Sequence, residues 1–488
     1  MEPAVYPHLM KDRCLVPPHP EVRKKILSSF KELKDIIAKN GDHAILQNLL
    51  RPVERRPAGY NDGLLRPHST FRPGTTLSAA RASHPKPRGV NYVAVVLVDF
   101  PDRKFDATQD TNFYNRLWFG IGTNSVRDYY RDVSHGLVDI QGQVVGPLRM
   151  PHSIKFYSDN QNGLGDNPPN ARVMAKDAAK LANKVITFTK YDNDGDGYVD
   201  AFVIVHAGQG AERTGLPTDI WSHKYVLDGG PYAADSTLIY AYLTVPADGK
   251  LGVCAHEIGH LLFGWPDLYD ADASSAGIGS WCLMASGSYN GNGDNPAEPC
   301  AWCKVDQGWV SVFNITQTAK VALADVKDSN QVLKMWKDGA PDTEYFLVEN
   351  RQMNRRDGDL PGGGLCLWHI DESKPDNNDE TQGYKVALVQ ADGLKQLERD
   401  DTERGDSGDP FPGDNNVRSC NWSTNPSTNA NNGAPTCVAI TDISNSAPVM
   451  TFTVNVSDYS GVPPGLYSGA PRGPKSIPAP IPVPIPQK

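Results

Sequence analysis

An uninterrupted apolar stretch at residues 251–264, LGVCAHEIGHLLFG, carries two histidines and a glutamate that a buried helix has to accommodate. Residues four apart lie on one face of a helix, so His256 and His260 point in the same direction. Two imidazoles at this spacing can bind one Zn²⁺, with Glu257 beside a metal-bound water whose proton it can take. Zinc lowers the pKa of that water to about 7, which provides a nucleophile at neutral pH. The alternative is a structural histidine pair on an ordinary helix.

The residues after this stretch are predicted to turn the chain back toward the histidines. Gly264 allows a left-handed exit from the helix, and Pro266 prevents the helix from continuing. The sequence WPDLYD then brings a carboxylate that can complete a set of three protein ligands. Downstream, GIGSWCLMASGSYNGNG places Met284 in a glycine- and serine-rich turn, as a floor beneath the zinc or as plain core. Tyr289, five residues on, is a candidate to bind the metal or a developing oxyanion.

A separate acidic loop has the spacing of a calcium site. Carboxylates occupy loop positions 1, 3, 5 and 9 and glycine occupies position 6, as in an EF-hand-like loop. The candidate calcium-binding residues are Asp192, Asp194, Asp196, Tyr198 and Asp200. Position 12 is Val203 instead of glutamate, so the closing ligand has to come from elsewhere. Carboxylates this close repel one another without a cation, which favours calcium over a simple Asp/Gly turn. The stretch GDSGDPFPGD at 405–414 is a second candidate ion site.

The composition of the 488-residue chain excludes several classes of protein. Its length indicates about two to four domains with sizeable cores. A formal net charge of -9 argues against nucleic acid as a main partner. The longest useful apolar run, at 93–98, is far shorter than the roughly 20 residues of a membrane span. The first residues, MEPAVYPHLMKDRC, lack the charged-then-apolar pattern of a signal peptide.

Periodicity outlines the organisation of the chain. Apolar residues at spacings of three and four predict an amphipathic helix over 22–37 that ends at Asn40-Gly41, and the Pro- and Arg-rich residues 51–89 read as a linker. YVAVVLVDF and AFVIVH are typical of buried strands, and 171–183 is helical in pattern, so about 90–310 is an α/β domain. Beyond Val312, short apolar stretches between Gly, Asp and Asn indicate a β-sandwich. The Pro-rich residues after Asp458 are expected to be extended and disordered.

The eight cysteines allow two interpretations. Cys420 and Cys437 bracket a polar loop as a short disulfide does, whereas the simpler alternative is a set of free, buried thiols. Cys300-x-x-Cys303 has the spacing of half a zinc knuckle or of a redox pair, but no second CxxC follows it. His206, His223 and His369 lie in strand-like or loop contexts without a partner at ligand spacing, so structural roles are expected for them.

Taken together, these motifs resemble the immune inhibitor A-type metalloproteases, zinc endopeptidases related to the metzincins. The similarity includes VAVVLVDFPD, SVRDYYRDVSHGLVDIQGQVVG, YDNDGDGYVDAFVIVHAGQGAE, PDLYD, GIGSWCLMASGS, GLCLWHIDES and GDPFPG, which run from about residue 92 to 456. The resemblance implies secretion, one catalytic zinc, structural calcium, an N-terminal prosegment and a C-terminal β-sandwich. The implied regions are a prosegment and linker at 1–88, an α/β (α+β) zinc metallopeptidase domain at 89–311, a β-sandwich at 312–457 and a tail at 458–488.

One departure from the family pattern concerns the third zinc ligand. The family pattern resembles HExxHxxGxxD, whereas Phe263 here adds a residue, so Asp267 lies seven positions beyond His260. One extra helical residue turns the chain by about 100°, yet the Gly-x-Pro-Asp sequence is preserved. Asp267 is therefore the leading third ligand. The alternatives are Asp270, Tyr289 and Glu298.

Cys14 is a candidate inhibitory switch, because a thiolate from the prosegment is able to occupy the water position on zinc until the segment is removed. The preferred interpretation is a secreted, monomeric zinc endopeptidase made as a zymogen, with protein or peptide substrates. Glu257 is its general base. One rival is a catalytically silent zinc- and calcium-containing adhesin or carbohydrate-binding protein that uses Trp336, Trp368 and Trp422. The other rival is a different zinc hydrolase, such as an aminopeptidase.

Overall fold

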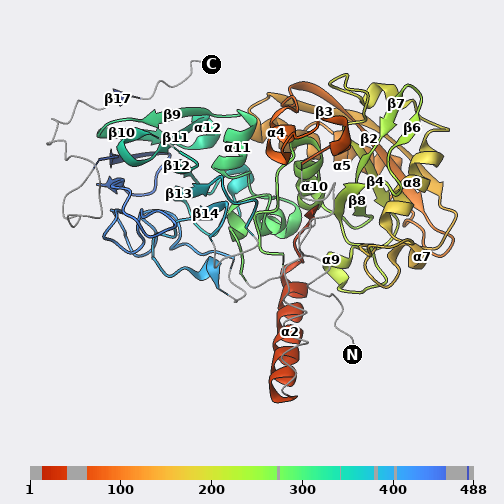
Figure 1. Ribbon diagram of the computed structural model, residues 1–488, viewed down its shortest axis with the longest axis horizontal. Helices are drawn as coiled ribbons and strands as arrows, with labels where there is room; N and C mark the ends of the chain where they lie inside the picture. The colour runs from red at the N-terminus through yellow and green to blue at the C-terminus, as the bar shows by residue number, and fades with distance from the viewer. Residues whose placement is uncertain are drawn as a thin grey trace. The chain divides into compact units, whose positions relative to one another are not determined.

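The computed structural model describes residues 14–40, 63–271, 275–340, 342–377, 383–399, 404–457 and 481–482. The chain forms two compact units (Figure 1). Unit 1 comprises Met1–Ser274 and Leu283–Pro296, and unit 2 comprises Ser275–Cys282 and Ala297–Lys488. The tail expected after Asp458 lies outside the described residues except for the short strand β17 (Ile481–Pro482).

A six-stranded mixed sheet forms the centre of unit 1. Its strand order is β1-β5-β8-β4-β2-β3, and the neighbours β8, β4, β2 and β3 run parallel, while β5 is antiparallel to β8 and β1 is antiparallel to β5. The two expected buried strands are both present. The strands are β1 (Cys14–Leu15), β2 (Gly89–Asp99), β3 (Val138–Arg149), β4 (Phe202–His206), β5 (His223–Val226) and β8 (Ala241–Pro246), with a hairpin of β6 (Tyr232–Ala234) and β7 (Thr237–Ile239) beside them.

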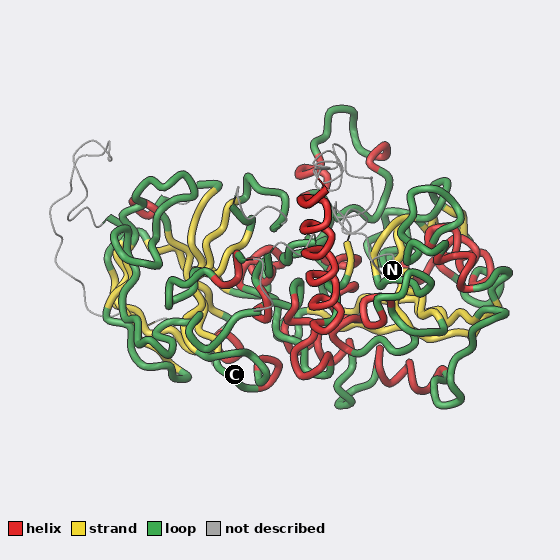
Figure 2. The backbone as a smooth tube through the Cα atoms, turned by 90° about the horizontal axis from the view of Figure 1, so that it is seen from below, coloured by secondary structure: helices red, strands yellow, loops and turns green. Residues whose placement is uncertain are grey.

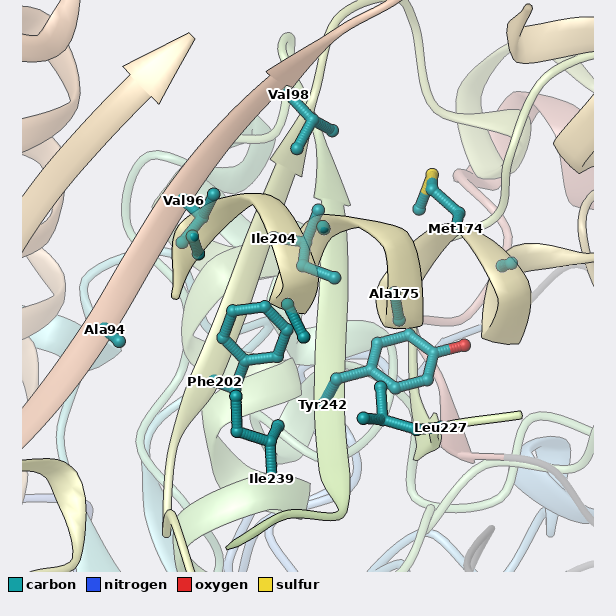
Figure 3. Packing of buried hydrophobic residues seen from close by; sticks show 14 of the residues in the cluster. Ala94, Val96, Val98, Met174, Ala175, Phe202, Ile204, Leu227, Ile239 and Tyr242 are labelled. Atoms are coloured by element: carbon teal, nitrogen blue, oxygen red, sulfur yellow. The ribbon is translucent and has the colours of Figure 1, made fainter. Parts of the chain in front are cut away.

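Helices pack their apolar faces against this sheet. Helix α8 (Ala171–Ala182) begins at Asn170, whose side chain accepts hydrogen bonds from two backbone N–H groups of the first turn. Its small buried face meets valines of β2 and aromatic residues of β4 and β8 in one cluster (Figure 3). The remaining helices that pack on unit 1 are α5 (Thr111–Phe119), α6 (Val126–Val133), α7 (Ile154–Ser158), η2 (Phe188–Tyr191), α9 (Ala211–Thr214), α10 (Leu251–Phe263) and η4 (Ser286–Gly293).

The residues before β2 are more structured than the sequence indicated. The amphipathic helix is present as α2 (Pro20–Asn40) and extends away from the rest of unit 1 in Figure 1. Residues 63–88, expected to be linker, contain η1 (His68–Thr70) and α4 (Leu77–Ala82). Two arginines connect this segment to the rest of unit 1: Arg66 pairs with Asp196 at 3.0 Å, and Arg81 donates to the carbonyl oxygen of Gly264 at 2.7 Å. Periodicity does not detect such polar contacts.

Unit 2 contains two sheets whose apolar side chains share one core. One sheet has the order β15-β16-β10-β17 and the other β14-β13-β12-β11-β9. The strands are β9 (Ser311–Ile315), β10 (Ala319–Ala324), β11 (Gln331–Met335), β12 (Glu344–Arg351), β13 (Gly364–Asp371), β14 (Val386–Leu388), β15 (Ala439–Thr441) and β16 (Val449–Asn455). Short helices connect them: η3 (Gly279–Trp281), α11 (Ala301–Gln307), α12 (Val326–Ser329), η5 (Lys337–Gly339), η6 (Arg355–Asp357) and η7 (Gln396–Glu398). The tube in Figure 2 shows the strands of both units in yellow. In the described part of the chain, no helix has the length and apolarity needed to cross a membrane.

Candidate functional site

Helix α10 lies in a fully enclosed part of unit 1, because all of its residues are buried. Two glycines let it approach the segment after residue 283. A Cβ at Gly252 would lie 1.8 Å from the carbonyl oxygen of Ser288, and a Cβ at Gly259 would lie 2.5 Å from Sδ of Met284. The glycine inside the HEIGH sequence is therefore required for Met284 to pack beneath the helix. The helix ends at Gly264, which has a φ of 65° and so provides the expected left-handed exit.

The chain reversal at Gly264 brings Asp267 to the two histidines. The Nε2 atoms of His256 and His260 are 3.1 Å apart, and each lies 3.1 Å from Oδ1 of Asp267. Ligand atoms about 2.0–2.1 Å from a tetrahedral zinc lie about 3.3 Å from one another, so these separations fit three protein ligands of one zinc ion. The extra residue Phe263 does not move Asp267 out of reach, because the non-helical residues after Gly264 absorb it.

The hydrogen bonds of the histidines fit the tautomer that binds a metal ion. Nδ1 of His256 lies 2.9 Å from the carbonyl oxygen of Leu283, and Nδ1 of His260 lies 2.7 Å from that of Trp265. A carbonyl accepts only, so each Nδ1 is assigned the proton, and in the neutral ring each Nε2 then presents the lone pair that a metal ligand needs. Burial lowers the pKa of His260 against the opposing effect of Asp267, which keeps that ring neutral. Lone pairs facing a carboxylate are stabilised by a metal ion, and the residues present therefore fit zinc.

Glu257 lies next to this cluster and is completely buried. Burial, followed by the charge of Asp267, raises the pKa of its carboxyl well above the ordinary value. Neither carboxylate oxygen has a hydrogen-bond partner among the described residues. The backbone N–H of Val16 opposes this rise in pKa, and a buried carboxylate with so few partners is unfavourable unless a water or ion faces it.

Residues 14–19 cross the same site as an extended segment. The carbonyl oxygen of Leu15 lies 3.0 Å from Nε2 of His256, and the N–H of Leu15 donates to Oδ2 of Asp267 at 3.2 Å. The N–H of Val16 donates to the carbonyl oxygen of Ser222 at 3.3 Å. Residues 14–18 are all buried. The segment that the sequence assigned to a prosegment thus fills the space next to the three ligands.

Two tyrosines contact different carbonyls of this segment. The hydroxyl of Tyr269 donates to the carbonyl oxygen of Leu15 at 2.9 Å, whereas that of Tyr289 donates to the carbonyl oxygen of Pro17 at 2.8 Å. Tyr289, the residue chosen from the sequence, therefore contacts a carbonyl two residues beyond the Leu15 carbonyl that lies next to His256. Tyr269 was not chosen, although its position two residues after Asp267 in PDLYD was a signal for it.

The remaining zinc candidates have other positions. Cys14 lies on β1, 2% exposed, and does not join the cluster of His256, His260 and Asp267. Glu298 belongs to unit 2, where it pairs with the buried Lys304 at 2.6 Å. Asp270 is buried in the loop after the ligand cluster.

Further contacts to residues 14–19 come from positions that no motif indicated. Nε1 of Trp221 donates to the carbonyl oxygen of Val16 at 2.8 Å, and the N–H of His19 donates to the carbonyl oxygen of Glu212 at 2.8 Å. The Glu212 carboxylate accepts from the N–H and hydroxyl of Ser222 at 3.1 and 2.6 Å. Burial raises the pKa of Glu212 to about 7. These partners are distant in sequence, so only the fold reveals them.

The acidic loop at 192–200 brings its carboxylates together in two overlapping groups. Asp192, Asp194 and Asp196 form one group, while Asp194 and Asp200 form another with His84. Burial raises the pKa of Asp200 to about 7, and the buried Oδ1 of Asp192 has no hydrogen-bond partner among the described residues. The donor set fits a hard cation such as calcium.

Segment 63–88 also reaches this acidic loop. A cavity of about 300 Å³ lies between them, and it is lined by residues 63–66 and 83–85 on one side and by residues 194–196 on the other. Within this contact Arg66 pairs with Asp196. Tyr198 keeps its place in the loop, where its N–H donates to Oδ1 of Asp196 at 2.9 Å.

The second acidic stretch, residues 405–414, forms a carboxylate group together with an aspartate from outside the stretch. Asp406 and Asp409 lie close to Asp392, which the sequence interpretation did not include. Nε1 of Trp281 donates to Oδ2 of Asp409 at 3.0 Å, and burial raises the pKa of Asp409 to about 7. Nε2 of Gln396 lies between Asp392 and Asp406, at 3.3 and 2.9 Å from their Oδ2 atoms.

All eight cysteines are buried and outside any disulfide, so the bond between Cys420 and Cys437, one of the two interpretations from the sequence, is not formed. Sγ of Cys420 instead donates to the carbonyl oxygen of Pro426 at 3.5 Å. The CxxC pair has a third neighbour, because Cys282, Cys300 and Cys303 form one buried group. Burial raises the pKa values of Cys300 and Cys303 well above the ordinary value, which favours their thiol forms.

The histidines expected to be structural each have a local contact. Nδ1 of His206 lies 3.3 Å from the carbonyl oxygen of Ala207, His223 contacts the hydroxyl of Tyr242 at 2.8 Å, and His369 pairs with Glu344 at 2.8 Å. Trp368 is fully buried and donates to Glu349 at 3.0 Å, so it has no free face for a sugar. Trp336 packs on the core of unit 2.

Comparison with known proteins agrees with this geometry. Residues 88–312 match the family described as Immune inhibitor A peptidase M6, catalytic domain. The chain is 31% identical over 273 residues to the pre-pro-metalloprotease PrtV of two strains of Vibrio cholerae serotype O1, which covers 43% of this chain and 29% of that protein. It is 32% identical over 251 residues to immune inhibitor A of Bacillus thuringiensis subsp. alesti, covering 41% of this chain and 36% of that protein. The chain thus spans about a third of the length of the curated relatives it matches. Residues 88–312 of this chain are therefore similar to the catalytic domain of the immune inhibitor A family of M6 peptidases.

Proposed function

We propose that the chain is a zinc-dependent endopeptidase that acts on proteins or peptides. The observation that carries this proposal is the cluster of His256, His260 and Asp267, whose ligand atoms converge at about 3.1 Å beside the buried Glu257. Zinc, when bound by these three residues, supplies Lewis acidity and lowers the pKa of a bound water. The resemblance of residues 88–312 to metalloproteases supports the same chemistry.

Glu257 is the general base in this proposal and later the proton donor. It takes a proton from the attacking water and delivers it to the amine that leaves when the peptide bond breaks. The carbonyls of Leu283 and Trp265 fix the ring orientation of the two histidines, so the site is pre-organised.

The structure of residues 14–19 supports synthesis as a zymogen. Leu15 and Val16 fill the space where a substrate would bind and exclude it as long as they remain. Cys14 stays a candidate switch residue, and it lies one residue before the carbonyl that faces His256. Removal of this segment is the expected activation step.

Structural calcium, secretion and a monomeric state complete the proposal. Calcium at Asp192, Asp194, Asp196, Tyr198 and Asp200 is supported by the convergence of the carboxylates and by the unpartnered Oδ1 of Asp192. The two sheets of unit 2 with their shared core support a β-sandwich at 312–457. Secretion is supported by the family resemblance alone. The rival adhesin is less favoured, because a structural zinc site does not need the adjacent Glu257.

The decisive experiment measures casein cleavage by the purified chain before and after limited proteolysis, with and without o-phenanthroline. We expect activity that rises on trimming, is abolished by the chelator and accompanies about one zinc per chain. Glu257→Ala should retain zinc and lose cleavage, whereas Glu21→Ala, at an exposed position of α2, should behave as the wild type. Retained cleavage by zinc-loaded Glu257→Ala would refute the assigned role. Cleavage of a substrate with blocked termini separates an endopeptidase from an aminopeptidase.

A further inference from the structure

We propose that residues 14–18 lie across the site in the register of a substrate, with Leu15–Val16 as the presented peptide bond, and that Tyr269 holds the oxygen of the reacting carbonyl. This inference rests on the proposed endopeptidase function and extends it to substrate register, subsite chemistry and a further catalytic residue. Tyr289 becomes a positioning residue for the part of the substrate that leaves as the amine.

The backbone pairing of β1 shows how an extended chain is recognised. Strand β1 adds to the edge of the six-stranded sheet, antiparallel to β5, with Cys14 opposite Lys224 and Leu15 opposite His223. Addition of a strand to a sheet edge supplies main-chain hydrogen bonds that do not depend on the side chains of the added strand. A substrate of another sequence can therefore make the same contacts once residues 14–18 have left.

The position of one carbonyl fixes the register. The oxygen of Leu15 lies 3.0 Å from Nε2 of His256, close to the 3.1 Å that separates the three ligand atoms from one another. A catalytic zinc leaves room for water or substrate beside its three protein ligands, and the Leu15 oxygen lies beside one of the three candidate ligand atoms. The bond that follows this carbonyl joins Leu15 to Val16, so these residues flank the bond that would be cut in a substrate.

The two tyrosines have different roles in this register. Tyr269 donates its hydroxyl proton to the oxygen of Leu15 at 2.9 Å, which is the atom that becomes negatively charged when water attacks the carbonyl. Hydrogen-bond donors at this position contribute about 10²–10³-fold to kcat. Tyr289 donates to the oxygen of Pro17 at 2.8 Å, two residues further along, and its ring contacts that of His19. Its hydrogen bond does not change as the reaction proceeds, so it contributes to binding.

The burial of the side chains on either side of the bond predicts substrate preference. Leu15 and Val16 are both completely buried, so the chain closes around an aliphatic side chain on each side. A charged side chain at either position would be buried without a partner, which is costly. The preferred substrates are therefore extended segments with aliphatic residues flanking the cleaved bond. In hydrolysis the water oxygen bonds to the carbonyl carbon, the C–N bond breaks, and Glu257 carries the water proton to the amine nitrogen.

The test uses the trimmed enzyme and blocked fluorogenic peptides with Leu-Val, Asp-Val or Leu-Asp at the central positions. We expect Tyr269→Phe to lower kcat for the Leu-Val peptide about 100-fold with KM little changed. Tyr289→Phe should raise KM about 5- to 10-fold with kcat within about threefold of wild type. Tyr114→Phe is the matched control, because it removes a buried hydroxyl that donates to Ala247 at 3.0 Å. Each Asp-containing peptide should be cleaved at least about tenfold less efficiently.

A binding measurement separates this inference from general damage. In a zinc-loaded Glu257→Ala background, a fluorescent peptide of residues 13–19 should bind about 5- to 10-fold more weakly when either Tyr269 or Tyr289 is replaced by Phe. A fall of kcat in Tyr289→Phe but not in Tyr269→Phe would overturn the assignment of the Leu15 carbonyl as the position of the reacting carbonyl. Equal cleavage of all three peptides would overturn the register. In both cases the protease function would stand, whereas a trimmed wild type that cleaves nothing would remove the proposed function itself.

Discussion

Replacement of Leu15 by alanine tests how residues 14–18 keep the site closed. The Leu15 side chain is completely buried, and truncation of a buried leucine costs about 2–5 kcal/mol. The backbone hydrogen bonds of Leu15 to Asp267 and Tyr269 are unaffected by this change, so the loss falls on side-chain packing. Since about 1.4 kcal/mol corresponds to a factor of ten, even the lower limit of about 2 kcal/mol shifts the ratio of closed to open forms about 30-fold.

The assay is peptide cleavage by the untrimmed, zinc-loaded chain. We expect Leu15→Ala to raise the rate of the untrimmed chain about 30-fold or more, up to the rate of the trimmed enzyme. Leu27→Ala is the matched control, because Leu27 lies on α2 and is only partly buried. Its rate should stay within about threefold of wild type. The reasoning would be refuted if both variants were as inactive as the wild type before trimming and equally active after it.

Three further predictions concern the wider structure. Calcium at about 100 times its Kd should raise the Tm of chelator-treated wild type by about 5–10 °C, and Asp194→Asn, which changes a member of both carboxylate groups, should remove most of this shift in calorimetry. Glu212 has a pKa raised by burial from 4.5 to about 7, so the folded state holds its proton more tightly than the unfolded state. Its contribution to stability is therefore present below about pH 4.5 and is lost as the pH rises to about 7, which lowers the free energy of unfolding by about 3 kcal/mol. In Glu212→Gln the denaturant concentration at the midpoint of unfolding should change less with pH over this window. The same pH dependence in wild type and variant would contradict the assignment. Lys304→Met removes the lysine that pairs with the buried Glu298 and Glu349 and leaves Glu349 only the more distant Arg351, so it should lower the free energy of unfolding by about 3–5 kcal/mol. Lys180→Met, which removes a half-exposed lysine paired with Asp177, should lower it by less than about 1 kcal/mol.

Local patterns in the sequence predicted the elements whose structure depends on local rules. The Val-rich run at 93–98 is a central strand because parallel strands are buried on both faces. The helix carrying His256 and His260 ends at Gly264, as its left-handed conformation requires. The placement of Asp267 was less certain because an inserted residue rotates a helix, yet here the insertion is followed by irregular chain that compensates for it.

The residues that sequence reasoning missed are brought to their sites by long-range contacts. Tyr269 contacts Leu15 across more than 250 positions, and Trp221 contacts Val16 across 205. Asp392 joins an acidic stretch that begins more than ten residues later, and Cys282 joins a CxxC pair 18 residues downstream. Pairing across such separations depends on topology, which periodicity and motif spacing do not encode. Of the two interpretations of Cys420 and Cys437, the structure agrees with buried thiols, because residue types that bracket a loop do not fix the positions of their sulfur atoms.

The edge position of β1 has a consequence for how the enzyme is handled once it is active. While β1 is in place, His223 and Lys224 of β5 have a neighbouring strand on both sides, β8 on one and β1 on the other. If residues 14–18 are removed as proposed, that side of His223 and Lys224 would be open, and an open edge pairs with any extended chain, including that of another molecule of the same protein. Self-digestion and self-association therefore share one surface, and a short peptide that occupies it should protect concentrated mature enzyme against both.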